Sequence, residues 1–152
     1  MKCPVCALAL TTHEAGPLHV EVCESGCGGI WFEAHELEQV DEDTEPVCRN
    51  VLRFKPNPDV PIDFNKARMC PKCHSSHLVR QFYDSTHMTE IESCIACGGV
   101  WLELAELDWI RQDNKLKSER ERKIKQYLED NLPDSGLELL PDSVRAVFKL
   151  IF

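Results

Sequence analysis

The residues of this chain that could carry chemistry are its cysteines, because eight of the nine stand in close pairs. The eight form two sets, which are Cys3, Cys6, Cys23 and Cys27, and then Cys70, Cys73, Cys94 and Cys97. Within the sets, sixteen and then twenty residues separate the two pairs, which is the spacing of a four-cysteine zinc site. We therefore predict two zinc ions, each bound by one set of four sulfurs.

Such sites are predicted to be structural. Four thiolates fill the tetrahedral shell that zinc prefers, so no position remains for a water molecule to be activated. The sequence also offers no Ser/His/Asp pattern and no phosphate-binding loop, and we expect no enzymatic activity. A redox dithiol is the rival interpretation, but no βαβ pattern surrounds the CxxC pairs. A metal-dependent hydrolase would need an open zinc position.

The first set differs from the second at one point. Its later pair is CxxxC, and Gly26 is well placed to absorb the extra residue. If Cys23 or Cys27 binds zinc imperfectly, His35 or His19 could replace it, and this alternative stays open. In the second half of the chain His74, His77 and His87 are expected at the surface. The ninth cysteine, Cys48, is expected to be a free, small apolar residue.

The cysteines belong to a longer internal repeat. Each set is followed by Gly-Gly, then a tryptophan, then Glu-x-x-Glu-Leu, as in Gly28 to Leu37 and Gly98 to Leu107. The glycines are expected to supply a positive φ beside the metal. Each tryptophan is expected to be the main core residue of its own module. Glu33 and Glu103 should begin a short helix, and Glu36 and Glu106 are expected to be solvated.

The run CPxC…CGGxWxxxxEL resembles the bacterial transcription factor IIB-type zinc finger family, a small module similar to a zinc ribbon. The match uses all eight paired cysteines together with Trp31, Trp101, Leu37 and Leu107. It implies a small α+β fold with two tandem four-cysteine modules of the zinc-ribbon or treble-clef type. Each would run knuckle, β-hairpin, knuckle and short helix. The family name implies a link to transcription, which fold alone does not establish.

Four segments follow from this repeat. They are a first zinc module (1–42), an acidic and Pro-rich linker (43–67), a second zinc module (68–112) and a helical tail (113–152). Apolar residues in the linker could lie against the modules. The tail has no Pro or Gly up to about Asn131, and Pro141-Asp142-Ser143 opens a last helix, Val144 to Phe152. That helix is apolar on more than one face, so it should pack on the chain, on a second copy or on a partner.

Charge and hydropathy limit the classes of partner and the cellular compartment that we expect for this chain. The formal net charge is −9, and two zinc-thiolate sites would take it to −13, which disfavours a general nucleic-acid binder. The exception is the basic segment 115–125, interpreted first as a solvated helix face and second as a nucleic-acid contact. No long apolar run predicts a membrane span or a secretory signal. We therefore expect a cytoplasmic protein with reduced thiols that binds a protein partner.

Overall fold

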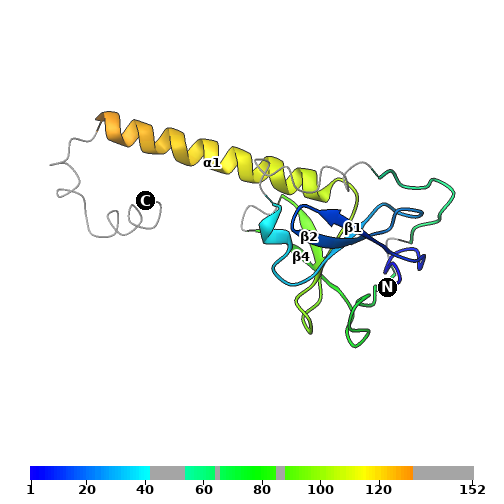
Figure 1. Ribbon diagram of the computed structural model, residues 1–152. Helices are drawn as coiled ribbons and strands as arrows, with labels where there is room; N and C mark the ends of the chain where they lie inside the picture. The colour runs from blue at the N-terminus through cyan, green and yellow to red at the C-terminus, as the bar shows by residue number, and fades with distance from the viewer. Residues whose placement is uncertain (42–53, 64–65, 85–87, 132–152) are drawn as a thin grey trace. The chain divides into compact units, whose positions relative to one another are not determined.

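Six short antiparallel strands, one 3₁₀ turn and one long helix account for the regular structure of the described residues. Figure 1 draws the chain as a ribbon. The computed structural model describes residues 1–41, 54–63, 66–84 and 88–131. The elements are β1 (Thr11–Ala15), β2 (Leu18–Val22), β3 (Ile30–Phe32), the 3₁₀ turn η1 (Leu37–Gln39), β4 (Val79–Phe82), β5 (Glu90–Ser93), β6 (Val100–Leu102) and α1 (Glu106–Asn131).

The first hairpin shows how the sequence produces these strands. In β2 the apolar residues Leu18, Val20 and Val22 alternate with polar ones, so one face of the strand is buried and the other is exposed. Gly16 has a φ of +66°, and with Pro17 it makes the tight turn that pairs Ala15 with Leu18. The segment between the two cysteine pairs is therefore a β-hairpin, as the repeat predicted.

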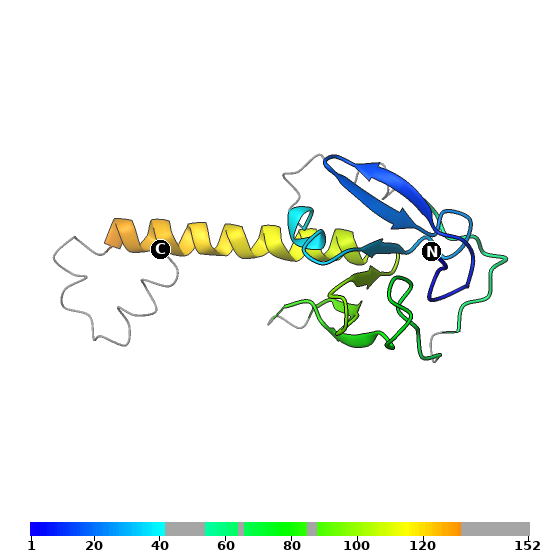
Figure 2. The same ribbon diagram turned by 60° about the horizontal axis from the view of Figure 1, so that its bottom comes forward.

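The two zinc modules share a single sheet. Its strand order is β1-β2-β3-β6-β5-β4, so the first module contributes one half and the second module the other half. The halves meet where β3 pairs antiparallel with β6 (Figure 2). Trp31 is the register partner of Trp101 at the centre of that pairing. Because the repeats meet through equivalent residues, they are related by an approximate two-fold axis, as in an isologous dimer.

Buried residues form two clusters. One is apolar and lies under the sheet with η1 and the start of α1, and it includes Val20, Phe32, Leu102, Leu107 and Ile110. The other surrounds the paired cysteines, and its members include Cys3, Leu10, Cys23, Cys27, Trp31, Cys70, Cys94 and Trp101. The second cluster joins residues of both modules, so one core serves both sets of cysteines.

The described end of the linker lies against the first module. The rings of Phe54 and His13 are 4.7 Å apart between centroids. The Asn57 N–H donates to the Gly26 carbonyl over 2.7 Å, and Ile62 packs on the cysteine cluster. The prediction of a docked linker is therefore confirmed for these residues. The rest of the linker, with Cys48, lies outside the described residues apart from Lys66 and Ala67.

Helix α1, Glu106–Asn131, joins the short helix of the second module and the first part of the predicted helical tail into one element. The chain divides into two compact units, Met1–Asp113 and Asn114–Phe152, and α1 continues from the first into the second. The basic segment 115–125 lies within α1, whereas the predicted last helix, Val144 to Phe152, lies outside the described residues. Within the described part, no helix has both the length and the apolar character that crossing a bilayer requires.

Candidate metal centres

The first set of cysteines converges on one point. Cys3 and Cys6 come from the first knuckle, and Cys23 and Cys27 flank a second knuckle between β2 and β3. The Sγ atoms of Cys3 and Cys27 are 3.5 Å apart, and those of Cys6 and Cys23 are 3.4 Å apart. All four Sγ atoms lie within 4.8 Å of one another.

The second set repeats this arrangement. The Sγ atoms of Cys70 and Cys97 are 3.6 Å apart, as are those of Cys73 and Cys94. Two serine hydroxyls lie close to these sulfurs: Ser75 Oγ is 3.1 Å from the Cys73 Sγ, and Ser76 Oγ is 3.0 Å from the Cys94 Sγ. Hydroxyl donors of this kind orient and stabilise thiolate ligands.

Both sets fit zinc. Four sulfurs at about 2.3 Å from a central zinc ion would be about 3.8 Å from one another. The observed S–S distances of 3.4–3.6 Å are close to that edge and much longer than a disulfide bond of about 2.05 Å. The chain therefore has two four-cysteine sites that are suitable for two structural zinc ions. When bound, the ion would supply cross-linking of the two knuckles and no open position for chemistry.

The electrostatics of the thiols agree with a cation site. In the first set, hydrogen bonds from neighbouring thiols lower the pKa of Cys23 to about 2, whereas hydrogen bonding to Cys23 raises the pKa of Cys27 to about 12. Four negative sulfurs this close repel one another, so only some of the thiols ionise readily by themselves. A divalent cation removes that repulsion, because it stabilises every thiolate in the set.

Residues with positive φ allow the chain to turn around the sulfurs. Gly28 and Gly98 have φ values of +77° and +72°, as the Gly-Gly pattern predicted for the residue after the last cysteine. Ala7 and His74, which follow the first pair of each set, adopt +63° and +53°. These two were not foreseen, because neither residue type signals a left-handed conformation.

The histidines that could have replaced a cysteine lie elsewhere. His35 is exposed, and its Nδ1 is 3.0 Å from a Glu38 carboxylate oxygen. His19 is exposed on β2. Among the described residues, each group that could hold a metal consists of four cysteines alone.

The second glycine of each Gly-Gly pair makes space for a tryptophan of the other module, which the sequence did not reveal. A Cβ on Gly29 would lie 2.2 Å from Cζ2 of Trp101, and a Cβ on Gly99 would lie 2.1 Å from Cζ2 of Trp31. Each tryptophan therefore packs against the metal-site turn of the other module. The expectation that each is a core residue was right, because both are fully buried. Each also packs against the other module because β3 pairs with β6, and this the sequence did not reveal.

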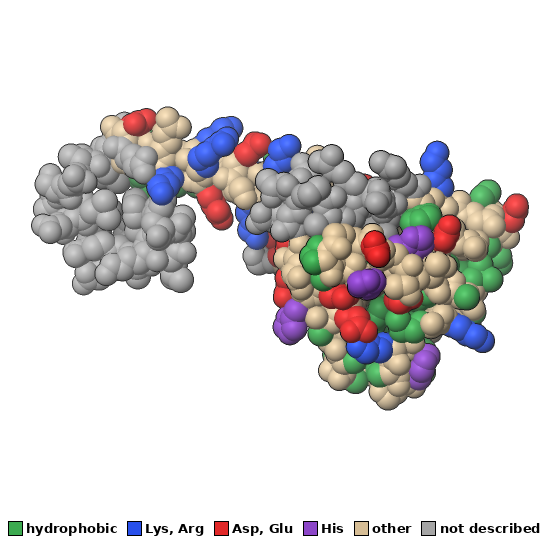
Figure 3. All heavy atoms as spheres, in the orientation of Figure 1, with side chains coloured by type: hydrophobic (Ala, Val, Ile, Leu, Met, Phe, Trp, Pro, Cys, Tyr) green, Lys and Arg blue, Asp and Glu red, His purple; other side chains and the backbone are tan. Residues whose placement is uncertain are grey.

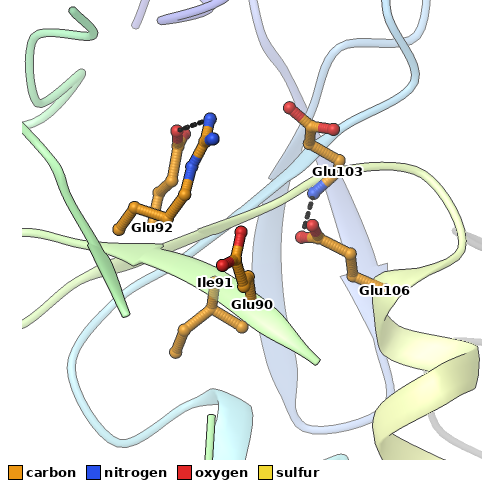
Figure 4. Close-up of a pocket in the computed structure, with 6 residues that line it drawn as sticks. Glu90, Ile91, Glu92, Glu103 and Glu106 are labelled. Atoms are coloured by element: carbon orange, nitrogen blue, oxygen red, sulfur yellow. Dashed lines mark hydrogen bonds and ion pairs between the residues drawn. The ribbon is translucent and has the colours of Figure 1, made fainter. Parts of the chain in front are cut away.

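The glutamates after each tryptophan cap a turn. The Glu33 N–H donates to a Glu36 carboxylate oxygen, and the Glu103 N–H donates to Glu106, both over 2.7 Å. Glu106 is not simply solvated, because burial raises its pKa to about 7, and Glu103 and Glu92 add to the shift. The carboxylates of Glu92, Glu103 and Glu106 line a pocket of about 150 Å³. Figure 4 shows them together with Glu90 and Ile91.

Two buried arginines went unnoticed in the sequence. Arg68 is 3% exposed, and its guanidinium lies 2.5 Å from Glu92 and 2.7 Å from Glu103. Arg111 on α1 donates through Nε to the Val40 carbonyl over 2.8 Å. Arg111 joins the two repeats, whereas Arg68 joins separate segments of the second repeat. No periodicity in the sequence marks partners so distant along the chain.

A comparison with protein families places these features together. The model of the family described as "Transcription factor zinc-finger", a zinc-ribbon family, matches residues 2–42 and 69–112. No curated protein and no solved structure matches the chain. The two matched segments cover more than half of the chain, and each contains one complete set of cysteines. The chain belongs to the transcription factor zinc-finger family, and it carries two tandem copies of its zinc ribbon.

Proposed function

We propose that this chain is a non-catalytic protein whose two joined zinc ribbons form a rigid platform for a partner protein. The observation that carries the proposal is the complete sulfur set at each site. Four cysteines leave zinc no position for a substrate or an activated water, so the metal would stabilise the fold. Zinc-ribbon families are in general non-catalytic, which supports the same conclusion.

Charge indicates the kind of partner. Residues 1–113 contain nine Lys and Arg against nineteen Asp and Glu, a formal charge of −10. Two zinc-thiolate sites would make it more negative by four. Acidic side chains are spread over the visible face of this unit (Figure 3). Complementary charge accelerates association and selects partners, so we propose a basic protein segment as the ligand.

The outer strand β4 of the sheet is the proposed place of contact. Strand β4 lies at one end of the strand order, and its Val79 side chain is 45% exposed. Edge strands offer backbone groups to which an extended segment of another protein can add as a further strand. Because the family is one of transcription factors, a basic component of the transcription machinery is the first partner to test.

Co-purification from native cells tests this proposal. We expect the intact chain and a Leu8→Glu control, altered at an exposed residue of the first module, to recover the same basic partner. Val79→Glu should lose most of it, and higher salt should weaken recovery in all three. Equal recovery by Val79→Glu would refute the edge as interface. A chain truncated after Leu132 tests separately whether residues 133–152 take part, and unchanged recovery would exclude them.

A second function is favoured by one observation, the basic character of α1. Residues 115–125 hold six Lys and Arg against two Glu, and Figure 3 shows Lys and Arg along this helix. We propose nucleic-acid binding through this segment as the alternative. It predicts retardation of DNA or RNA at low salt, with a salt slope that falls by about one for each phosphate-contacting Lys or Arg removed. Absence of retardation at low salt would refute nucleic-acid binding by this segment.

A further inference from the structure

The two metal sites are linked by the two tryptophans at the centre of the sheet. Trp31 and Trp101 each lie four residues after the last cysteine of their own set. They face each other across the pairing of β3 with β6, and both are fully buried. Neither indole N–H has a hydrogen-bond partner among the described residues, so packing positions the rings.

Each indole ring packs directly against a glycine of the opposite module, and the contact leaves no space for a side chain there. A Cβ on Gly29 would lie 2.2 Å from the Trp101 ring, and one on Gly99 would lie 2.1 Å from the Trp31 ring. Carbon atoms that are not bonded normally stay about 3.5–4.0 Å apart. The position of each tryptophan therefore depends on where the other module holds its Gly-Gly turn.

Backbone hydrogen bonds from the cysteines of each set hold the Gly-Gly turn in place. The Cys23 N–H donates to the Gly29 carbonyl over 2.9 Å, and the Cys94 N–H donates to the Gly99 carbonyl over 2.8 Å. A cysteine of each set is thus one hydrogen bond from the glycine that receives the other module's tryptophan. If a set loses its metal and its knuckle moves, this glycine moves with it.

Other side chains of each module also contact the Gly-Gly turn or the metal-site loop of the other module. A Cβ on Gly28 would lie 3.4 Å from Cδ1 of Leu104, and one on Gly98 would lie 3.1 Å from the Ala34 Cβ. Leu104 and Ala34 occupy equivalent positions in the repeat. The second module's Lys72, which lies between Cys70 and Cys73, also places its Nζ 2.7 Å from Glu33 of the first module.

We propose that the two sites bind zinc with positive cooperativity, and that the exchange of Trp31 and Trp101 transmits it. Zinc at one set fixes its Gly-Gly turn, which seats the tryptophan of the other module and so orders the strand that follows the last cysteine of the second set. The second ion then binds to a site that is already partly ordered. Coupling must be equal in both directions, because it is a difference in binding free energy. Conversely, loss of one ion should weaken the hold on the other.

The test is native mass spectrometry of the full chain, equilibrated under reducing conditions with one zinc ion per chain. Two independent sites, equal or unequal, leave at least half of the molecules with a single zinc. For two sites of equal intrinsic affinity, a tenfold coupling lowers that fraction to about one quarter, and a hundredfold coupling to about one tenth. We expect a single-zinc fraction clearly below half, with apo and two-zinc chains in excess. A fraction of half or more would overturn the proposal.

Substitutions at the tryptophans test whether these rings transmit the coupling between the two metal sites. Trp101→Leu keeps an apolar residue but removes the ring that touches Gly29, and we expect its single-zinc fraction to rise to about half. Trp109→Leu is the matched control, because Trp109 lies on α1 and is 54% exposed, and it should behave as the wild type. Unchanged cooperativity in Trp101→Leu would exclude the tryptophan route. If that variant binds no zinc, Trp101→Phe takes its place, with a smaller rise expected.

Discussion

The exchange of tryptophans makes a sharp prediction for Gly29→Ala. The new Cβ would lie 2.2 Å from Cζ2 of Trp101, so the ring or the strand must move by more than about 1 Å to restore normal contact. Overpacking of a buried site costs about 1–3 kcal/mol, and a fully buried ring between two paired strands should fall at the upper end. For a unit of this size, Tm should fall by on the order of 10 °C.

Thermal unfolding followed by circular dichroism, in excess zinc, measures the effect, and a double-mutant cycle assigns its cause. Combining Gly29→Ala with Trp101→Leu should cost much less than the sum of the two single changes, because the second removes the clash. Combining Gly29→Ala with Trp31→Leu should be close to additive. If the non-additivity appeared with Trp31 instead, each tryptophan would pack in its own module and the described pairing would be wrong.

Three further predictions concern the metal, a buried carboxylate and a buried arginine. X-ray absorption should show two zinc ions per chain, each with four sulfurs near about 2.3 Å, and a strong chelator should abolish the sheet signal in circular dichroism; a chain that kept its fold without metal would contradict this. The pKa of Glu106 is about 7 in the folded state and about 4.5 in the unfolded state, so between these values the folded state binds more protons. The contribution of Glu106 to the free energy of unfolding therefore falls as pH rises from about 4.5 to 7, and it is constant above pH 7. Glu106→Gln should therefore gain stability over the wild type as pH rises from about 5.5 to 7, reaching on the order of 2 kcal/mol, and a difference independent of pH would count against it. Arg68→Met leaves Glu92 and Glu103 without their buried cation and should cost about 3–5 kcal/mol in the free energy of unfolding. Arg80→Met, which removes a half-exposed partner of the same Glu92, should cost about 1 kcal/mol or less, and equal costs in chemical denaturation would refute the distinction.

Local patterns explain why the metal centres were accessible to sequence reasoning. A CxxC pair closes a turn that aims two sulfurs at one point, and this needs no distant residue. The structure groups the eight cysteines in the two predicted sets, and Gly28 and Gly98 have the expected positive φ. The hairpin between the first pairs is equally local, because Leu18, Val20 and Val22 alternate with polar residues and Gly16 makes the turn.

Other predictions depended on contacts between segments that are distant along the chain, and several of them were incomplete. Glu106 was expected in solvent, but the second module folds Glu92 and Glu103 around it. Arg68 carried no motif, yet it is buried between two carboxylates from different segments. The partner of this protein stays a prediction, because a binding surface depends on the ligand as well as on the chain.

The sequence by itself determined two repeats, two sets of four thiols and the short strands between them, because each follows from residue types at close spacing. Only the tertiary structure decided that the repeats form one sheet and exchange their tryptophans. A short strand such as β3 leaves one edge unsatisfied, and nothing in its own residues says which strand will cover it. The pairing with β6 wins because it satisfies both edges and buries Trp31 and Trp101 together against the glycines that make room for them.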